Sequence, residues 1–126
     1  MLKRAIAGVL GAMAAANGAM MLIAGRHWYD TTPSVADTGP FNPHFVADVG
    51  AAYTVAGLSL VARAFRPEYW PAAVAGAAFF CAHAIIHVIG LLGGHSHHAG
   101  FEWALVVIPA IASFWAAFPS KGDMNA

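Results

Sequence analysis

Apolar residues along this chain form four long runs that are separated by short polar breaks. The runs cover residues 5–24, 45–62, 72–92 and 101–118, and each is close to the roughly 20 residues that a helix needs to cross a membrane. The runs lack the alternation of apolar and polar positions that marks a barrel strand. A helix also satisfies its own backbone hydrogen bonds in lipid. The pattern therefore predicts an all-α fold, an integral membrane four-helix bundle.

The breaks between the runs are rich in turn-forming residues. Residues 26–43 include three prolines, residues 63–71 form a short charged turn, and residues 93–100 make the third break. Short connections of this kind predict a single domain over residues 1–126. Asn42 followed by Pro43 is a typical helix start, so we expect Asn42 to cap the second helix. The long loop before it is expected to fold over the mouth of the bundle as a lid or docking surface.

Composition supports the membrane assignment. Hydrophobic residues make up 60% of the chain, charged residues make up 10%, and the mean hydropathy is +0.64, whereas soluble domains carry about 25% charged residues. The formal net charge is +0, and without a basic patch a nucleic-acid partner is excluded.

The first apolar run continues past the small residues at 14–16 to Ala24, so we expect it to be retained as a helix and not cleaved as a signal.

Basic residues fall mainly on one predicted side of the membrane. That side, which holds both termini and the middle turn, carries Lys3, Arg4, Arg63, Arg66 and Lys121. The opposite side carries only Arg26. By the positive-inside rule, both termini are expected in the cytoplasm. The sequence thus predicts a multi-pass membrane protein, with the lipid bilayer as its surroundings.

All seven histidines are expected on the opposite side or in the membrane interior. His44 and Asp48 are four residues apart, as are His83 and His87, so each pair shares one face of its helix. Glu102 begins the fourth helix at the same side. Ionisable groups within a membrane are costly and usually face the bundle interior or one another. We therefore expect Asp48 to contact His87.

Imidazole and carboxylate groups together suit zinc, iron, manganese or oxidised copper. The sequence predicts a transition-metal site whose ligands are Asp48, His83 and His87. His44 and Glu102 either complete this ligand set or hydrogen-bond to one of the ligands and fix its tautomer. The histidine tract at residues 95–98 is a candidate loading site for the ion. Such a protein could be a redox enzyme subunit or a metal-handling accessory, and the sequence does not choose between catalysis and storage.

Other interpretations of the same residues remain open. His83 and His87 could be neutral side chains hydrogen-bonded to Asp48, to Asn17 or to carbonyls, or they could relay protons. Histidines on different helices, for example His44 and His87, could bind a b-type haem as axial ligands. The chain could also be a non-catalytic assembly subunit. Its glycine-rich faces would favour a homo-oligomer or a place in a larger membrane complex.

In helix number, size and glycine-rich helices, the whole chain resembles the small bacterial inner-membrane proteins described as DoxX-like. This resemblance implies a four-helix bundle in the inner membrane, with a redox or accessory role there. It rests on architecture, so it implies no site residues. The His and Asp cluster comes from this sequence alone.

Overall fold

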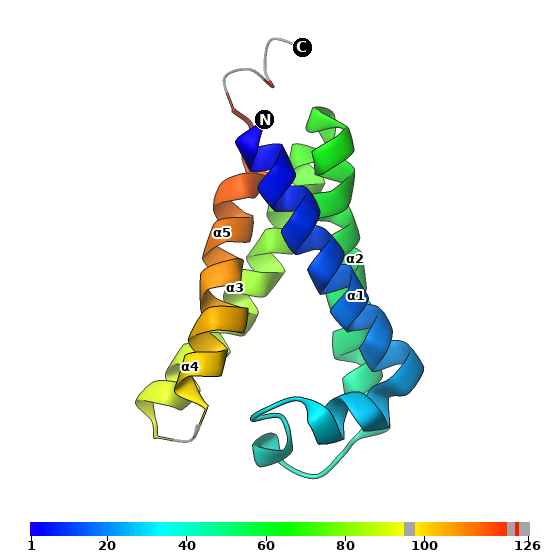
Figure 1. Ribbon diagram of the computed structural model, residues 1–126, viewed down its shortest axis with the longest axis vertical. Coiled ribbons are helices and arrows are strands. Elements are labelled where there is room, and N and C mark those ends of the chain that lie inside the picture. Colours follow the sequence, from blue (N-terminus) through cyan, green and yellow to red (C-terminus); the bar gives the residue numbers. More distant parts are fainter. Residues whose placement is uncertain (95–97, 121–122, 124–126) are drawn as a thin grey trace.

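The computed structural model describes residues 1–94, 98–120 and 123. Four long helices dominate it (Figure 1). The first three are α1 (Leu2–Thr31), α2 (Pro43–Phe65) and α3 (Trp70–Leu92), and the fourth joins α4 (Ala99–Glu102), a π-helical turn (Trp103–Val107) and α5 (Ile108–Ala117). Short 3-10 turns lie at Ala36–Thr38 (η1) and Pro67–Tyr69 (η2). All four helices are long and apolar enough to cross a membrane, which confirms the prediction of an all-α fold with four membrane-length helices.

The first helix continues beyond its predicted end. Ala24, where the apolar run stops, has non-helical angles (φ −133°, ψ 42°), and a further helical segment then reaches Thr31. Trp28 on this segment donates from its indole nitrogen to Asn17 Oδ1 at 2.9 Å. In a straight helix, 11 residues span about 16 Å, so the bond depends on the break at Ala24. Pro33 ends the segment, because the residue before a proline avoids the helical region.

The bundle has two chemically different ends. The start of α1 and the end of α5 lie together (Figure 1), and Lys3 Nζ lies 3.4 Å from the carbonyl oxygen of Phe118 there. We call this the basic end, because it carries Lys3, Arg4, Arg63 and Arg66. The opposite end is called the histidine end, because it carries His27, His44, His87 and His98.

Glycines bring α1 and α2 into close contact along their length. A Cβ atom added at Gly11 would lie 2.6 Å from the carbonyl oxygen of Gly57, and one added at Gly18 would lie 2.5 Å from that of Gly50. No real side chain tolerates such separations, so the two backbones touch where their glycines meet. The two helices therefore behave as one closely packed pair.

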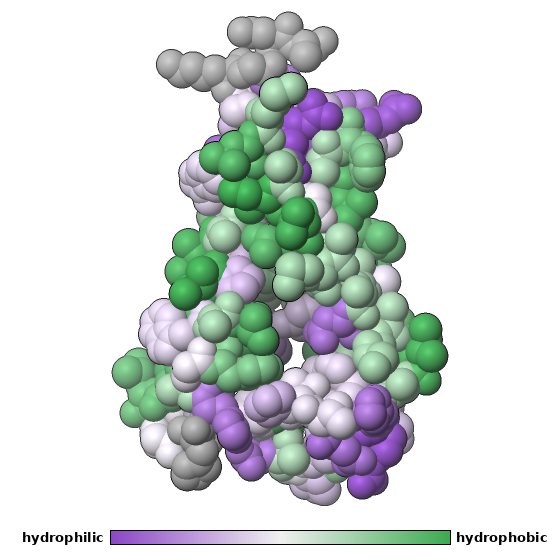
Figure 2. All heavy atoms as spheres, in the orientation of Figure 1, coloured by the Kyte–Doolittle hydropathy of each residue, from purple (hydrophilic) through white to green (hydrophobic). Residues whose placement is uncertain are grey.

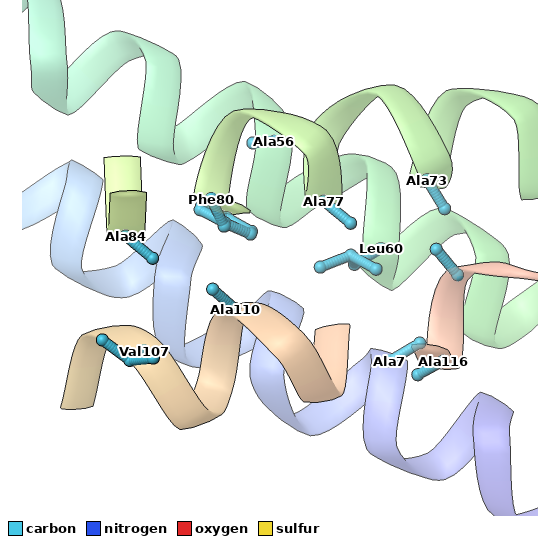
Figure 3. Packing of buried hydrophobic residues seen from close by; sticks show 11 residues of the cluster. Ala7, Ala56, Leu60, Ala73, Ala77, Phe80, Ala84, Val107, Ala110 and Ala116 are labelled. Atoms are coloured by element: carbon cyan, nitrogen blue, oxygen red, sulfur yellow. The ribbon is translucent and has the colours of Figure 1, made fainter. Parts of the chain in front are cut away.

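The other helices meet this pair mainly toward the basic end. Leu60, Ala73 and Ala77 are fully buried there, and Figure 3 shows small side chains from all four long helices packing around them. Toward the histidine end, Ala84 of α3 still packs in the cluster with Val107, but this pair of helices diverges from α1 and α2 (Figure 1). The protein has the shape of an inverted V whose legs separate at the histidine end.

Two arginines bind the carboxyl ends of neighbouring helices at the basic end. Arg4 donates to the carbonyl oxygens of Ala64 and Phe65 at 2.9 and 3.0 Å. Arg63 is fully buried, and it donates to the carbonyl oxygen of Ala117 at 2.8 Å and to Asp123 at 2.8 Å. The last carbonyls of a helix lack partners within it and carry partial negative charge. These arginines therefore cap the carboxyl ends of α2 and α5.

Replacing Gly18 by Ala should destabilise the protein by about 1–3 kcal/mol, because the new methyl group would overlap the backbone of α2. Gly90→Ala is the matched control, since a Cβ there meets nothing within 4 Å. The stability of both variants is measured by thermal unfolding in detergent, monitored through tryptophan fluorescence. Equal melting temperatures for the two variants would contradict the contact between α1 and α2.

The pair of Arg63 and Asp123 should make stability depend on pH only under acidic conditions. The Ser120 backbone N–H and hydroxyl and the Arg63 guanidinium hold the pKa of Asp123 below its ordinary value. Because the folded-state pKa is the lower one, the stabilisation is complete above about pH 4 and is lost as the pH falls further. Asp123→Asn should lower the melting temperature by a few degrees at pH 7. That difference should persist at pH 5 and shrink below pH 4, and a difference that disappeared by pH 6 would contradict this pairing.

Candidate functional site

Three of the predicted side chains come together near the histidine end. His87 Nδ1 lies 3.2 Å from Glu102 Oε2, and His87 Nε2 lies 3.1 Å from His83 Nε2. Glu102 is buried, with 3% of its surface exposed, and the His87 side chain is 24% exposed. The prediction that His83 and His87 share a helical face is confirmed. The contacts form a continuous chain from Glu102 through His87 to His83.

A local irregularity of the fourth helix lies next to Glu102. The π-helical turn Trp103–Val107 follows it directly, and Pro109 comes two residues after that turn. Proline has no N–H to continue the ordinary helical pattern. A π turn inserts one extra residue into the helix. The residues before the turn, Glu102 among them, are therefore rotated about the helix axis by about 100° relative to α5. Such turns often occur at functional sites, and here the turn accompanies a carboxylate that faces α3.

The contact to Glu102 fixes the chemistry of His87. When Glu102 is ionised it can only accept hydrogen bonds, and His87 Nδ1 is then the donor in this contact. In a neutral imidazole the other nitrogen, Nε2, then carries a lone pair directed toward His83. Two such lone pairs cannot lie 3.1 Å apart without a positive centre between them. The pair of nitrogens must share either a proton, which the Nε2–H of either ring can supply, or a metal ion.

The orientation of the rings bears on that choice. The His83 and His87 ring centroids are 4.7 Å apart, with an interplanar angle of 60°. A straight N–H···N bond of the observed length would put the centroids about 5.4 Å apart, since each lies about 1.15 Å behind its nitrogen. The nitrogens therefore do not point directly at each other. Two nitrogens bound to one ion at about 2.1 Å and at about 95–110° lie about 3.1–3.4 Å apart, which matches the observed separation.

Aromatic rings surround His83 on the side away from His87. The Tyr53 ring of α2 meets it edge to face at 5.4 Å, and the Phe79 ring of α3 stacks on it at 6.2 Å. Tyr53 also contacts Phe80 at 5.3 Å. These contacts restrict rotation of the His83 imidazole and hold its Nε2 toward His87. The inner part of the site is therefore apolar and its outer part is polar.

The second predicted pair lies apart from the first. His44 Nε2 is 3.6 Å from Asp48 Oδ2, and the two side chains are 88% and 66% exposed. The predicted cap at Asn42 is confirmed, because its side chain accepts hydrogen bonds from the backbone N–H groups of His44 and Phe45. Within the described residues no hydrogen bond joins Asp48 to His87, so the expected contact is wrong. α2 begins on the leg that diverges from α3 and presents this pair at the surface.

The described part of the chain contains no group of three or more His, Cys, Asp or Glu side chains arranged to hold one metal ion. Glu102 binds the Nδ1 side of His87, so it does not join the two Nε2 atoms at a common point. In the histidine tract, residues 95–97 lie outside the described residues. Asn17, weighed as a partner of His83 or His87, is bound to Trp28 instead.

A cavity of about 350 Å³ opens onto the site. Figure 2 shows the molecule hollowed between its two legs near the histidine end. One wall is formed by Ile86, His87, Gly90 and Glu102, and the other by Ser34, Asp37 and Thr38. The loop between α1 and α2 was predicted to cover the mouth of the bundle, and it does line this opening. Its three polar residues were not singled out, because no helical periodicity marks a residue in a loop.

Comparison of the chain with models of known protein families, with characterised proteins and with solved structures finds no match.

Proposed function

We propose that this protein binds a divalent transition-metal ion at the histidine end of its bundle and acts as a metal-handling subunit of the membrane. His83 and His87 are the protein ligands, each through Nε2. The observation that carries this proposal is the separation of 3.1 Å between those nitrogens, combined with rings that do not face each other head on. Neutral imidazole suits zinc, copper and iron.

Glu102 supports this function from behind His87. Histidines that bind metals usually donate their other ring N–H to a carboxylate, which fixes the tautomer and makes the ligand more basic. The bond from His87 Nδ1 to Glu102 has this arrangement. Glu102 is only 3% exposed. Because little water surrounds it, the electrostatic effect of its carboxylate on His87 is strengthened. In this proposal Glu102 orients a ligand and is not itself one.

Water or residues beyond this trio would fill the remaining coordination positions of the ion, as in metal sites that keep open positions. The positive-inside rule places the basic end in the cytoplasm. The site then faces the opposite compartment, which is the periplasm if the membrane is a bacterial inner membrane. The DoxX-like resemblance and association with itself or with a larger complex stay predictions. In this proposal the exposed pair of His44 and Asp48 does not bind the ion.

Replacing His87 by Ala should lower the affinity for zinc or copper at least tenfold, because one of the two ligands is lost and Glu102 no longer orients the site. His44→Ala is the matched control, since His44 also lies four residues from an ionisable partner but is exposed on the other leg. Elemental analysis and competition titration on protein purified without a histidine tag measure both. Unchanged binding in His87→Ala would overturn the proposal.

An absorption spectrum of the same preparation tests the haem alternative. A Soret band that is lost in both His44→Ala and His87→Ala would support axial ligation by those two residues. The metal proposal expects no such band, and it expects metal content to depend on His83 and His87 alone. Preparations without metal that also fail to bind added metal would favour a structural role for the histidines.

Replacing Glu102 by Gln should reduce metal affinity about 10–100-fold, because the neutral amide supports the His87 tautomer less strongly. Glu68→Gln is the control, since Glu68 is exposed and pairs with Arg66 at 3.7 Å, away from the site. Melting temperatures without metal separate the two roles. A variant that melts earlier but binds metal normally would show that Glu102 only locks α3 to the fourth helix.

A further inference from the structure

The cavity between the two legs has one wall that the metal site does not explain. Ser34, Asp37 and Thr38 form it, and they face His87 and Glu102 across the opening. Among the described residues that line this space, the ionisable side chains are those of Asp37, Glu102 and His87, and none is a lysine or an arginine. A concave space lined by one sign of charge concentrates ions of the opposite sign.

Contacts within the connecting loop hold this wall in place. The Tyr29 hydroxyl donates to the carbonyl oxygen of Gly39, and the Tyr29 ring packs on Phe41 at 5.3 Å. The guanidinium of Arg26 lies over the other side of this cluster, 5.3 Å from the Phe41 ring centroid. The η1 turn that carries Asp37 is thus anchored to the end of α1.

The backbone at Ser34 is a second indication that the segment leading into the η1 turn has a defined conformation. Its φ of +66° lies in the left-handed region, which residues other than glycine seldom adopt. Such angles cost free energy and persist only where the surrounding structure imposes them. Ser34 lines the cavity, so the unusual backbone shapes the wall directly.

Among residues 1–94, 98–120 and 123, no lysine or arginine forms an ion pair with Asp37. Arg26 is the only lysine or arginine between residues 5 and 62, and it pairs with Asp30 at 2.8 Å. The Asp37 carboxylate is exposed at the cavity wall. An exposed carboxylate on the wall of a cavity that a second carboxylate, Glu102, also lines attracts cations into that space.

The size of the cavity suits a hydrated ion. Water occupies about 30 Å³ per molecule in the liquid, so a space of about 350 Å³ has room for about ten waters. A divalent ion with its first shell of water therefore fits without being stripped. His87 lines the same space, so an ion in the cavity can exchange water for imidazole there.

We infer that this cavity is the route by which a hydrated divalent cation reaches and leaves the histidine pair, and that Asp37 captures the ion on the way. This inference rests on the proposed function, since it names how that site is loaded. Asp37 acts through charge and through the water shell of the ion, while the two histidines bind it directly. The role of Asp37 can be separated from that of the histidines by comparing the rate of metal association with the affinity for the metal.

The first test is the rate of zinc association, measured by stopped flow on the full chain in detergent. Asp37→Asn should slow association several-fold at low salt, and the effect should shrink at high salt, because screening weakens the attraction. Asp48→Asn is the control, since it removes the same charge at the same end but from an exposed position outside the cavity. Equal slowing by both variants would overturn the role of Asp37.

The second test blocks the cavity without touching the ligands. Gly90 lines it, and a Cβ there meets nothing within 4 Å, so Gly90→Leu should fill space without a clash. We expect zinc association and dissociation to slow by the same factor, with affinity unchanged. Gly100→Leu is the control, because Gly100 has equally open surroundings but does not line the cavity.

The outcomes separate the inference from the proposed function. If the unmodified protein binds no zinc, copper or iron, both fail. If it binds metal through His87 while Gly90→Leu leaves both rates unchanged, the route is wrong and the metal site stands.

Discussion

The close contact between α1 and α2 is the constraint on which the rest of the structure depends. Gly11 meets Gly57 and Gly18 meets Gly50 at backbone distance, so the two helices run side by side with no room for a side chain at those four positions. In lipid, apolar side chains gain little by leaving their surroundings, and close backbone packing becomes a main source of association. One leg of the bundle is therefore set by four small residues.

That rigid pair explains why a cavity forms. The third and fourth helices contact it through alanines and Leu60 toward the basic end, where small residues again allow close approach. Toward the histidine end the legs separate (Figure 1). The space between them holds the ionisable groups that a fully packed membrane bundle would have to bury against lipid-like atoms at considerable cost.

The two ends of the molecule use charge in different ways. At the basic end, Arg4 and Arg63 satisfy carbonyl groups of other helices, and Arg63 also binds Asp123. Those arginines link helices whose ends would otherwise carry unpaired acceptors. At the histidine end, Glu102 accepts from His87 and sets the direction of its remaining lone pair. The first arrangement closes the structure, and the second brings the Nε2 atoms of His87 and His83 within 3.1 Å of each other.

The sequence by itself determined the features that depend on local pattern. The apolar runs predicted four membrane-length helices, the spacing of four residues predicted that His44 would share a face with Asp48 and His83 with His87, and Asn42 predicted its own cap. Helical periodicity is a property of a few turns, so it can be recognised without a partner helix.

Only the tertiary structure decided which pair would face inward. His44 and Asp48 have the same spacing as His83 and His87, yet the first pair is exposed and the second is half-buried against Glu102. The rotation of each helix about its axis is set by the glycine contacts of α1 with α2 and by the π turn beside Glu102. Burial of Arg63 and the position of Asp37 on a cavity wall depend on the same packing. These features arise between segments that are far apart in the chain, and no local pattern encodes the angle at which such segments meet.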